Sequence, residues 1–343
     1  MISITNNEII ICGYKLVSYD YYNYSRIPLL INSLFNLQST NKFKKIHIEF
    51  VDSPAIKFSG LDHIINLIIA ELNLTPDQLV ITTVDKSYIN SVATVKYRPT
   101  PYFELVRSVI PDNPTWQTHN NSVLFGAVFG RFSIDRFLLA SFLETKLKQD
   151  SFVIFQPTEL WMKNHFDSDC NFKELYKEQL SWYNNKTKVE QAIPTNQGPG
   201  GSGGVHWKNS TKDYVNIWPK YKIEIVAETD PHNKYQITEK TTRCLITKKP
   251  FIIMSGCGVL QHLKNLGFQT FDPWINESYD QEPIVNQRLQ MIQQEILRIA
   301  QLSESDKSQM FIGIQSALDY NQSYYDKIVY NYYKHFKNDS CET

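Results

Sequence analysis

A short loop in the second half of the chain brings together the residues best suited to hold a charged ligand. An apolar, strand-like segment leads to Glu228, the chain breaks at Pro231, and a helix is predicted to begin after Thr238. Thr238 can cap that helix, and Glu239 in its first turn suits the positive end of the helix dipole. Lys240 is a cation at the same positive end, which costs up to roughly 1 kcal/mol unless an anion lies there too. Because helix N-termini bind phosphate, this spacing is typical of a site for a phosphorylated ligand.

The same segment resembles the donor-binding motif of the α1,3-fucosyltransferase family and related glycosyltransferases. The resemblance lies in Thr-Glu-Lys at residues 238–240, after a strand that ends in glutamate and before the apolar segment at residues 250–253. In that family the glutamate contacts ribose and the lysine contacts the diphosphate, which implies these roles for Glu239 and Lys240. Glu228 corresponds to the glutamate of the family's strand-end motif, although this chain has Glu-Thr-Asp where the family usually has Glu-Asn-Ser. The alternative is that Glu239 and Lys240 are solvated residues of an ordinary helix start.

The resemblance covers about residues 120 to 300 and implies an α/β fold with two Rossmann-like domains that face a cleft, the GT-B arrangement. It implies a glycosyltransferase that moves a sugar, with fucose as one candidate, from a nucleoside diphosphate sugar to a hydroxyl acceptor such as a glycan. The nucleotide-sugar is then a co-substrate, and no separate cofactor is expected.

Alternating strand-like and helix-like segments predict α/β structure at the start of the chain. Strands are expected at residues 9–12, 46–51 and 79–84, with a helix at 61–72. Strand, helix and strand in this order are typical of a parallel α/β sheet.

Four prolines between residues 97 and 121 mark the predicted junction between domains. The predicted N-terminal domain, on the acceptor side, covers residues 1–115. The nucleotide-sugar domain is predicted over 116–300, and a tyrosine-rich helical tail over 301–343.

The second domain is predicted to open with a strand at residues 123–129 and a helix capped by Ser133. The resemblance implies that an arginine at this turn binds the diphosphate, with Arg136 as the first choice and Arg131 as the second. A planar guanidinium suits this role because it can bind two phosphate oxygens at once. The alternative is a surface salt bridge from Arg136 to a nearby carboxylate.

A glycine turn joins a predicted strand at residues 250–254 to a predicted helix at 259–266. Such a turn presents backbone N–H groups at the carboxyl edge of the sheet, where α/β proteins bind ligands. We therefore expect Gly256 and Gly258 to line the donor site.

Transfer to a hydroxyl with inversion of configuration requires a carboxylate that removes the proton of the acceptor. In the GT-B architecture this base comes from the N-terminal domain. The candidates are Glu49 and Asp52, at the carboxyl end of a predicted strand, and Glu104. Two other functions compete with transfer. One is a non-catalytic nucleotide- or glycan-binding module of the same fold, and the weaker one is a Rossmann oxidoreductase, which would need a G-x-G-x-x-G after the first strand.

Charge and composition narrow the classes of partner. Lysine and arginine together number 35, as do aspartate and glutamate, so nothing predicts attraction to nucleic acid. No segment approaches the roughly 20 apolar residues of a membrane span, and no signal peptide is recognised, so we expect a soluble, cytoplasmic protein. Five scattered cysteines suggest neither a disulfide framework nor a zinc site. The D-x-D triplet at residues 167–169 is too short a motif to predict a metal site.

Overall fold

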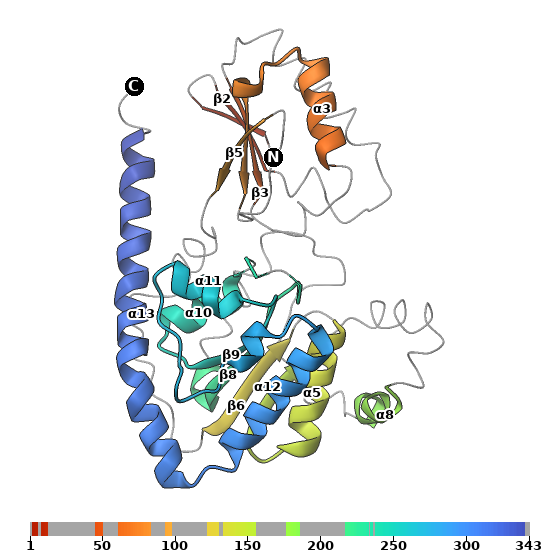
Figure 1. Cartoon of the computed structure of the whole chain (residues 1–343), viewed down its shortest axis with the longest axis vertical. Coiled ribbons are helices and arrows are strands. Elements are labelled where there is room, and N and C mark those ends of the chain that lie inside the picture. Colours follow the sequence, from red (N-terminus) through yellow and green to blue (C-terminus); the bar gives the residue numbers. More distant parts are fainter. Residues whose placement is uncertain are drawn as a thin grey trace. The chain divides into compact units, whose positions relative to one another are not determined.

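The chain divides into two compact units, residues 1–101 and residues 102–343 (Figure 1). Each unit contains a β-sheet and helices, and each is described by itself below. The computed structural model describes residues 2–5, 8–12, 45–50, 61–83, 93–97, 122–129, 133–155, 176–185, 217–232, 234–235 and 237–339.

The N-terminal unit contains a five-stranded sheet with the strand order β1-β2-β3-β4-β5. Strands β2 to β5 pair in parallel, and only the edge strand β1 runs antiparallel to its neighbour β2. The sequence predicted neither β1 nor β5, and the antiparallel β1 makes the sheet mixed rather than purely parallel. The strands are β1 (Ile2–Thr5), β2 (Glu8–Cys12), β3 (Lys45–Phe50), β4 (Leu79–Thr83) and β5 (Thr94–Tyr97).

The helix α3 (Leu61–Glu71) and the short helix η2 (Pro76–Gln78) lie between β3 and β4 in the chain. Ile65 and Ile68, which are spaced to share one face of α3, are fully buried, as are Ile46 of β3 and Ile81 of β4. The predicted order of strand, helix and strand is therefore confirmed, and the buried isoleucines form the core of this unit.

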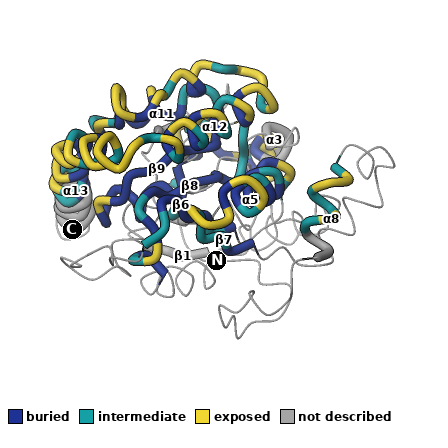
Figure 2. Tube along the Cα trace, turned by 90° about the horizontal axis from the view of Figure 1, so that it is seen from below, coloured by how far each residue is buried: buried dark blue, intermediate teal, exposed yellow. Residues whose placement is uncertain are grey.

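The C-terminal unit contains a four-stranded, fully parallel sheet with the strand order β7-β6-β8-β9. Strands β6, β8 and β9 coincide closely with segments that the sequence predicted. Their residues are mostly buried, which is usual for a parallel sheet covered on both faces (Figure 2). The strands are β6 (Val123–Phe129), β7 (Ser151–Phe155), β8 (Tyr221–Ala227) and β9 (Phe251–Met254).

Helices connect these strands and cover the sheet. Helix α5 contacts β7 and lies beside α12, which also contacts β9, whereas α10 packs against α13 (Figure 1). No helix in the described part of the chain is long and apolar enough to cross a membrane. The helices of this unit are α5 (Ile134–Lys146), α8 (Lys177–Asn185), η4 (Trp218–Lys220), α10 (Glu239–Ile246), α11 (Val259–Asn265), η5 (Ser278–Gln281), α12 (Val285–Ala300) and α13 (Glu304–Asp339).

Long helix α13 is fixed to the rest of its unit by polar contacts as well as by apolar packing. The side-chain amide of Asn321 donates to the carbonyl of Gln269 at 2.8 Å and accepts from its N–H at 2.8 Å. Gln322 donates to the carbonyl of Ile246 at the end of α10, at 2.6 Å. The predicted C-terminal helix is thus an integral part of the unit, at least over the residues that make these contacts.

Candidate site at the carboxyl edge of the parallel sheet

The order β7-β6-β8-β9 creates a switch point between β6 and β8. The connection after β6 leads to β7, toward one edge of the sheet. The connection after β8 leads to β9, toward the opposite edge. In open α/β sheets a crevice forms at the carboxyl ends of two such strands, and ligands bind there. Helices α5 and α10 both begin at this edge, so their positive ends lie near the same place.

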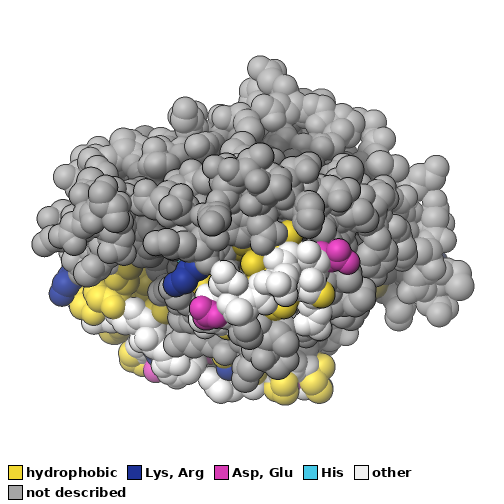
Figure 3. Space-filling view, turned by 90° about the horizontal axis from the view of Figure 1, so that it is seen from above, with side chains coloured by type: hydrophobic (Ala, Val, Ile, Leu, Met, Phe, Trp, Pro, Cys, Tyr) yellow, Lys and Arg dark blue, Asp and Glu magenta, His cyan; other side chains and the backbone are white. Residues whose placement is uncertain are grey.

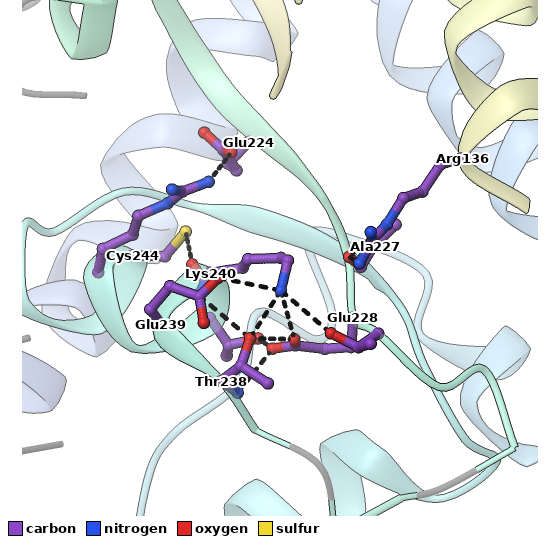
Figure 4. A network of polar contacts seen from close by, with 11 residues as sticks. Arg136, Glu224, Ala227, Glu228, Thr238, Glu239, Lys240 and Cys244 are labelled. Atoms are coloured by element: carbon purple, nitrogen blue, oxygen red, sulfur yellow. Dashed lines mark hydrogen bonds and ion pairs between the residues drawn. The ribbon is translucent and has the colours of Figure 1, made fainter. Parts of the chain in front are cut away.

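Glu228 ties the end of β8 to the first turn of α10 (Figure 4). Its side chain is fully buried. The carboxylate accepts hydrogen bonds from the N–H of Thr238 at 3.0 Å, from the hydroxyl of Thr241 at 2.6 Å and from the hydroxyl of Thr238. Helix α10 begins at Glu239 with Thr238 as its N-cap, as the sequence predicts. The three donors satisfy this buried carboxylate, and together they fix the shape of the loop.

Lys240 lies between two carboxylates. Its ammonium group is 3.1 Å from a carboxylate oxygen of Glu239 and 3.6 Å from one of Glu228. It also donates hydrogen bonds to the hydroxyls of Thr238 at 3.0 Å and Thr229 at 3.4 Å. The anion that a cation needs at a helix N-terminus is therefore supplied by the chain itself. The side chain remains 15% exposed, so the ammonium group is not sealed off from solvent.

The carboxylate of Glu239 is strongly favoured over the neutral acid. Burial by itself would raise the pKa of Glu239, but the charges of Lys240 and Arg243 outweigh it. Hydrogen bonds from Lys240 and from the backbone act in the same direction, and the pKa falls to about 2. At neutral pH this group is an anion that can only accept hydrogen bonds.

Arg136 joins the start of α5 to the end of β8. It is buried, whereas the alternative, a surface salt bridge, would place it at the surface. Its Nε and Nη2 atoms donate to the carbonyl of Ala227 at 3.2 and 2.9 Å. Arg136 therefore lies at the switch point, next to the residue that precedes Glu228, whereas Arg131 is outside the described residues. Ser133 occupies the N-cap position of α5 as predicted, although its side chain makes no capping hydrogen bond.

Gly256 and Gly258 follow β9 at the same edge of the sheet. Gly258 has a φ of +84°, a conformation that favours glycine, and its N–H donates to the carbonyl of Asp280 at 2.7 Å. A Cβ at this position would lie 3.4 Å from the side chain of Lys234. The turn is thus placed where the sequence predicts it, and its contact with a ligand stays a prediction.

Sequence reasoning missed the arginine at the start of α12. Arg288 is buried, and its two terminal nitrogens donate to the carbonyl of Glu282 and, at 2.5 Å, to the carbonyl of Pro231 in the loop after β8. Arg288 thereby holds α12 against the loop that leads to Thr238. A charged residue directly before Leu289, within the apolar stripe of the helix, was the signal in the sequence.

A second buried polar cluster lies at the opposite, amino end of the strands. Lys249 donates to the carbonyls of Trp218 and Tyr221, and Arg243 donates to Glu224 at 3.3 Å. Burial lowers the pKa of Lys249 to about 8, although the charge of Glu224 opposes this shift. We interpret these contacts as part of the core, because α/β sheets bind ligands at the other edge.

The side chains of all three candidates for the catalytic base lie outside the described residues. Glu49 lies on β3, where its backbone is paired with Thr82 of β4, and its side chain is outside the described residues. Asp52 and Glu104 are outside them altogether. The role of each as a base stays a prediction.

The described part of the chain contains no group of three or more histidine, cysteine, aspartate or glutamate residues that could hold a metal ion. The triplet at residues 167–169 lies outside it. Figure 3 shows one face of the molecule on which the described charged side chains, basic and acidic, lie singly among apolar and polar ones.

Comparison with models of protein families, with curated proteins and with solved structures gave no match to this chain. The resemblance to the fucosyltransferases therefore rests on the short sequence motif and its context.

Proposed function

We propose that the chain is a glycosyltransferase that holds a nucleoside diphosphate sugar at the carboxyl edge of the sheet β7-β6-β8-β9. The sugar, with fucose as one candidate, would pass to a hydroxyl of an acceptor such as a glycan. The observation that best supports this proposal is the position of the Glu239-Lys240 helix start. It lies at the switch point of a parallel sheet, beside the buried Arg136.

The proposed chemistry depends on charge at this edge. A departing diphosphate gains negative charge, which cations and a helix N-terminus stabilise. Lys240 and the start of α10 would supply this stabilisation. Glu239, ionised because its pKa is about 2, would accept hydrogen bonds from hydroxyls of the ribose.

A non-catalytic nucleotide- or glycan-binding module is the second candidate. It is favoured by the contacts of Lys240, whose charge is already balanced by Glu228 and Glu239. A site in which the lysine is so firmly held suits binding as well as it suits turnover. Release of free nucleoside diphosphate from the sugar conjugate separates the two functions, since a binding module would release none.

Replacing Lys240 with alanine tests the proposed phosphate contact. We expect the affinity for a nucleoside diphosphate to fall at least about ten-fold, because a charge-assisted hydrogen bond contributes roughly 1.5 to 3 kcal/mol. The affinity for the free nucleoside should change little. Titration calorimetry with both ligands on the parent chain and the variant measures the difference.

Lys248→Ala is the matched control, since Lys248 follows the other end of α10 and its side chain is 40% exposed. This control should bind both ligands as the parent chain does. Equal weakening of diphosphate and nucleoside by Lys240→Ala would mean that the lysine does not face the phosphates.

A further inference from the structure

Two buried charged side chains at the carboxyl edge have polar atoms without partners. Asp135, in the first turn of α5, is 5% exposed, and Arg288, in the first turn of α12, is 2% exposed. Among the described residues, neither Oδ2 of Asp135 nor Nε of Arg288 has a hydrogen-bond partner. Burying such groups without partners costs free energy, and in a native protein each case needs an explanation.

The two side chains come from the first turns of two helices that pack against each other. Helices α5 and α12 contact each other, and Arg288 binds the carbonyl of Pro231, three residues after Glu228. Burial lowers the pKa of Arg288, and the negative charge of Asp135 is among those that oppose the shift. The carboxylate therefore acts on the guanidinium through space although no direct hydrogen bond joins them.

Exposed apolar residues adjoin the pair. Ile134, directly before Asp135, is 38% exposed. Ile284, whose carbonyl accepts the N–H of Arg288 at 2.9 Å, is 53% exposed. An exposed apolar side chain thus stands close in the sequence to each buried charged residue, a combination that suits a ligand ring with an apolar face and polar edges.

The missing partners differ in kind. A carboxylate oxygen needs a hydrogen-bond donor, whereas the Nε–H of arginine needs an acceptor. A hydroxyl group is both at once. We propose that Asp135 and Arg288 form a subsite for a sugar hydroxyl of the bound ligand, either on the transferred sugar or on the ribose. This inference rests on the proposed function, because it assigns part of the same nucleotide-sugar.

The test is the variant Asp135→Asn, which keeps the shape of the side chain and removes its charge. We expect the affinity for the nucleotide-sugar to fall at least about ten-fold, since the lost hydrogen bond is charge-assisted. The melting temperature should stay the same or rise, because Oδ2 of the removed carboxylate has no hydrogen-bond donor among the described residues. A merely structural carboxylate would show the opposite pattern, with a lower melting temperature and unchanged affinity.

Asp150→Asn is the matched control, because Asp150 is an exposed aspartate directly before β7, at the amino edge of the sheet. It should leave both measurements unchanged. Three ligands identify the hydroxyl: a nucleoside diphosphate, its sugar conjugate and its 2′,3′-dideoxy form. A loss confined to the conjugate assigns the transferred sugar, and a loss with conjugate and diphosphate but not with the dideoxy form assigns the ribose.

Two results would overturn the inference. If the parent chain binds the conjugate and Asp135→Asn binds it equally well, the subsite is refuted while the proposed function stands. An equal loss for all three ligands would also refute it, since the contact would then not involve a hydroxyl. If the parent chain binds none of them, the proposed function fails and the subsite fails with it.

Discussion

Replacing Glu228 with alanine should destabilise the C-terminal unit by about 3 to 5 kcal/mol, the usual cost of breaking a buried charged network. The substitution removes the acceptor of three hydrogen bonds from Thr238 and Thr241. It also removes one of the two carboxylates beside Lys240. The loop after β8 would lose its connection to α10, and with it the arrangement of the candidate site.

Chemical denaturation followed by tryptophan fluorescence measures this loss. All six tryptophans of the chain lie after residue 101, so the signal reports on the C-terminal unit alone. Glu228→Gln, which keeps one acceptor oxygen, should be destabilised less than Glu228→Ala. The control Glu304→Ala removes a surface carboxylate that is 85% exposed, and it should leave the stability nearly unchanged because exposed ion pairs contribute little. A loss below about 1 kcal/mol for Glu228→Ala would show that these hydrogen bonds do not hold the unit together.

One of three carboxylates, Glu49 or Asp52 of the N-terminal unit or Glu104 shortly after it, should be essential for transfer and dispensable for donor binding. The variants are Glu49→Gln, Asp52→Asn and Glu104→Gln, in this order of expectation, because the carboxyl end of a parallel strand exposes side chains to ligands. Loss of a general base lowers the rate by about 10²- to 10⁴-fold. The affinity for the donor should be unchanged, since the donor is assigned to the carboxyl edge of the sheet β7-β6-β8-β9.

Transfer rate and donor affinity are measured for each variant beside Glu71→Gln, a control at an exposed carboxylate of α3. If all three variants retain normal transfer, the base lies elsewhere. If the parent chain shows neither transfer nor donor hydrolysis with any acceptor, the binding-module function becomes the better account.

Most of the fold was predictable because its signals are local. Apolar runs located β2, β3 and β4 in one sheet and β6, β8 and β9 in the other, and Thr238 marked the start of α10 to the residue. The antiparallel strand β1 was missed because pairing between neighbouring segments depends on register rather than on composition.

The site was only partly predictable, because its charges come from separate elements. The cost that Lys240 brings to a helix start suggested a bound anion, yet the chain itself supplies Glu228 from 12 residues earlier, together with Glu239. The proximity of Asp135 and Arg288 depends on how α5 packs against α12, which no local pattern encodes. Sequence reasoning therefore missed Arg288, which lies among the apolar residues on the buried face of α12.

Thermal denaturation of the whole chain in the presence of nucleotides tests the central claim most directly. The ligands are GDP, UDP, ADP and CMP, their sugar conjugates and the matching free nucleosides. A ligand at about 100 times its dissociation constant stabilises the folded chain by about 2.7 kcal/mol. We predict that one diphosphate and its sugar conjugate raise the melting temperature of the C-terminal unit by several degrees, and that the matching nucleoside raises it much less. Absence of any shift at millimolar concentrations of every ligand would contradict the proposed nucleotide-sugar site.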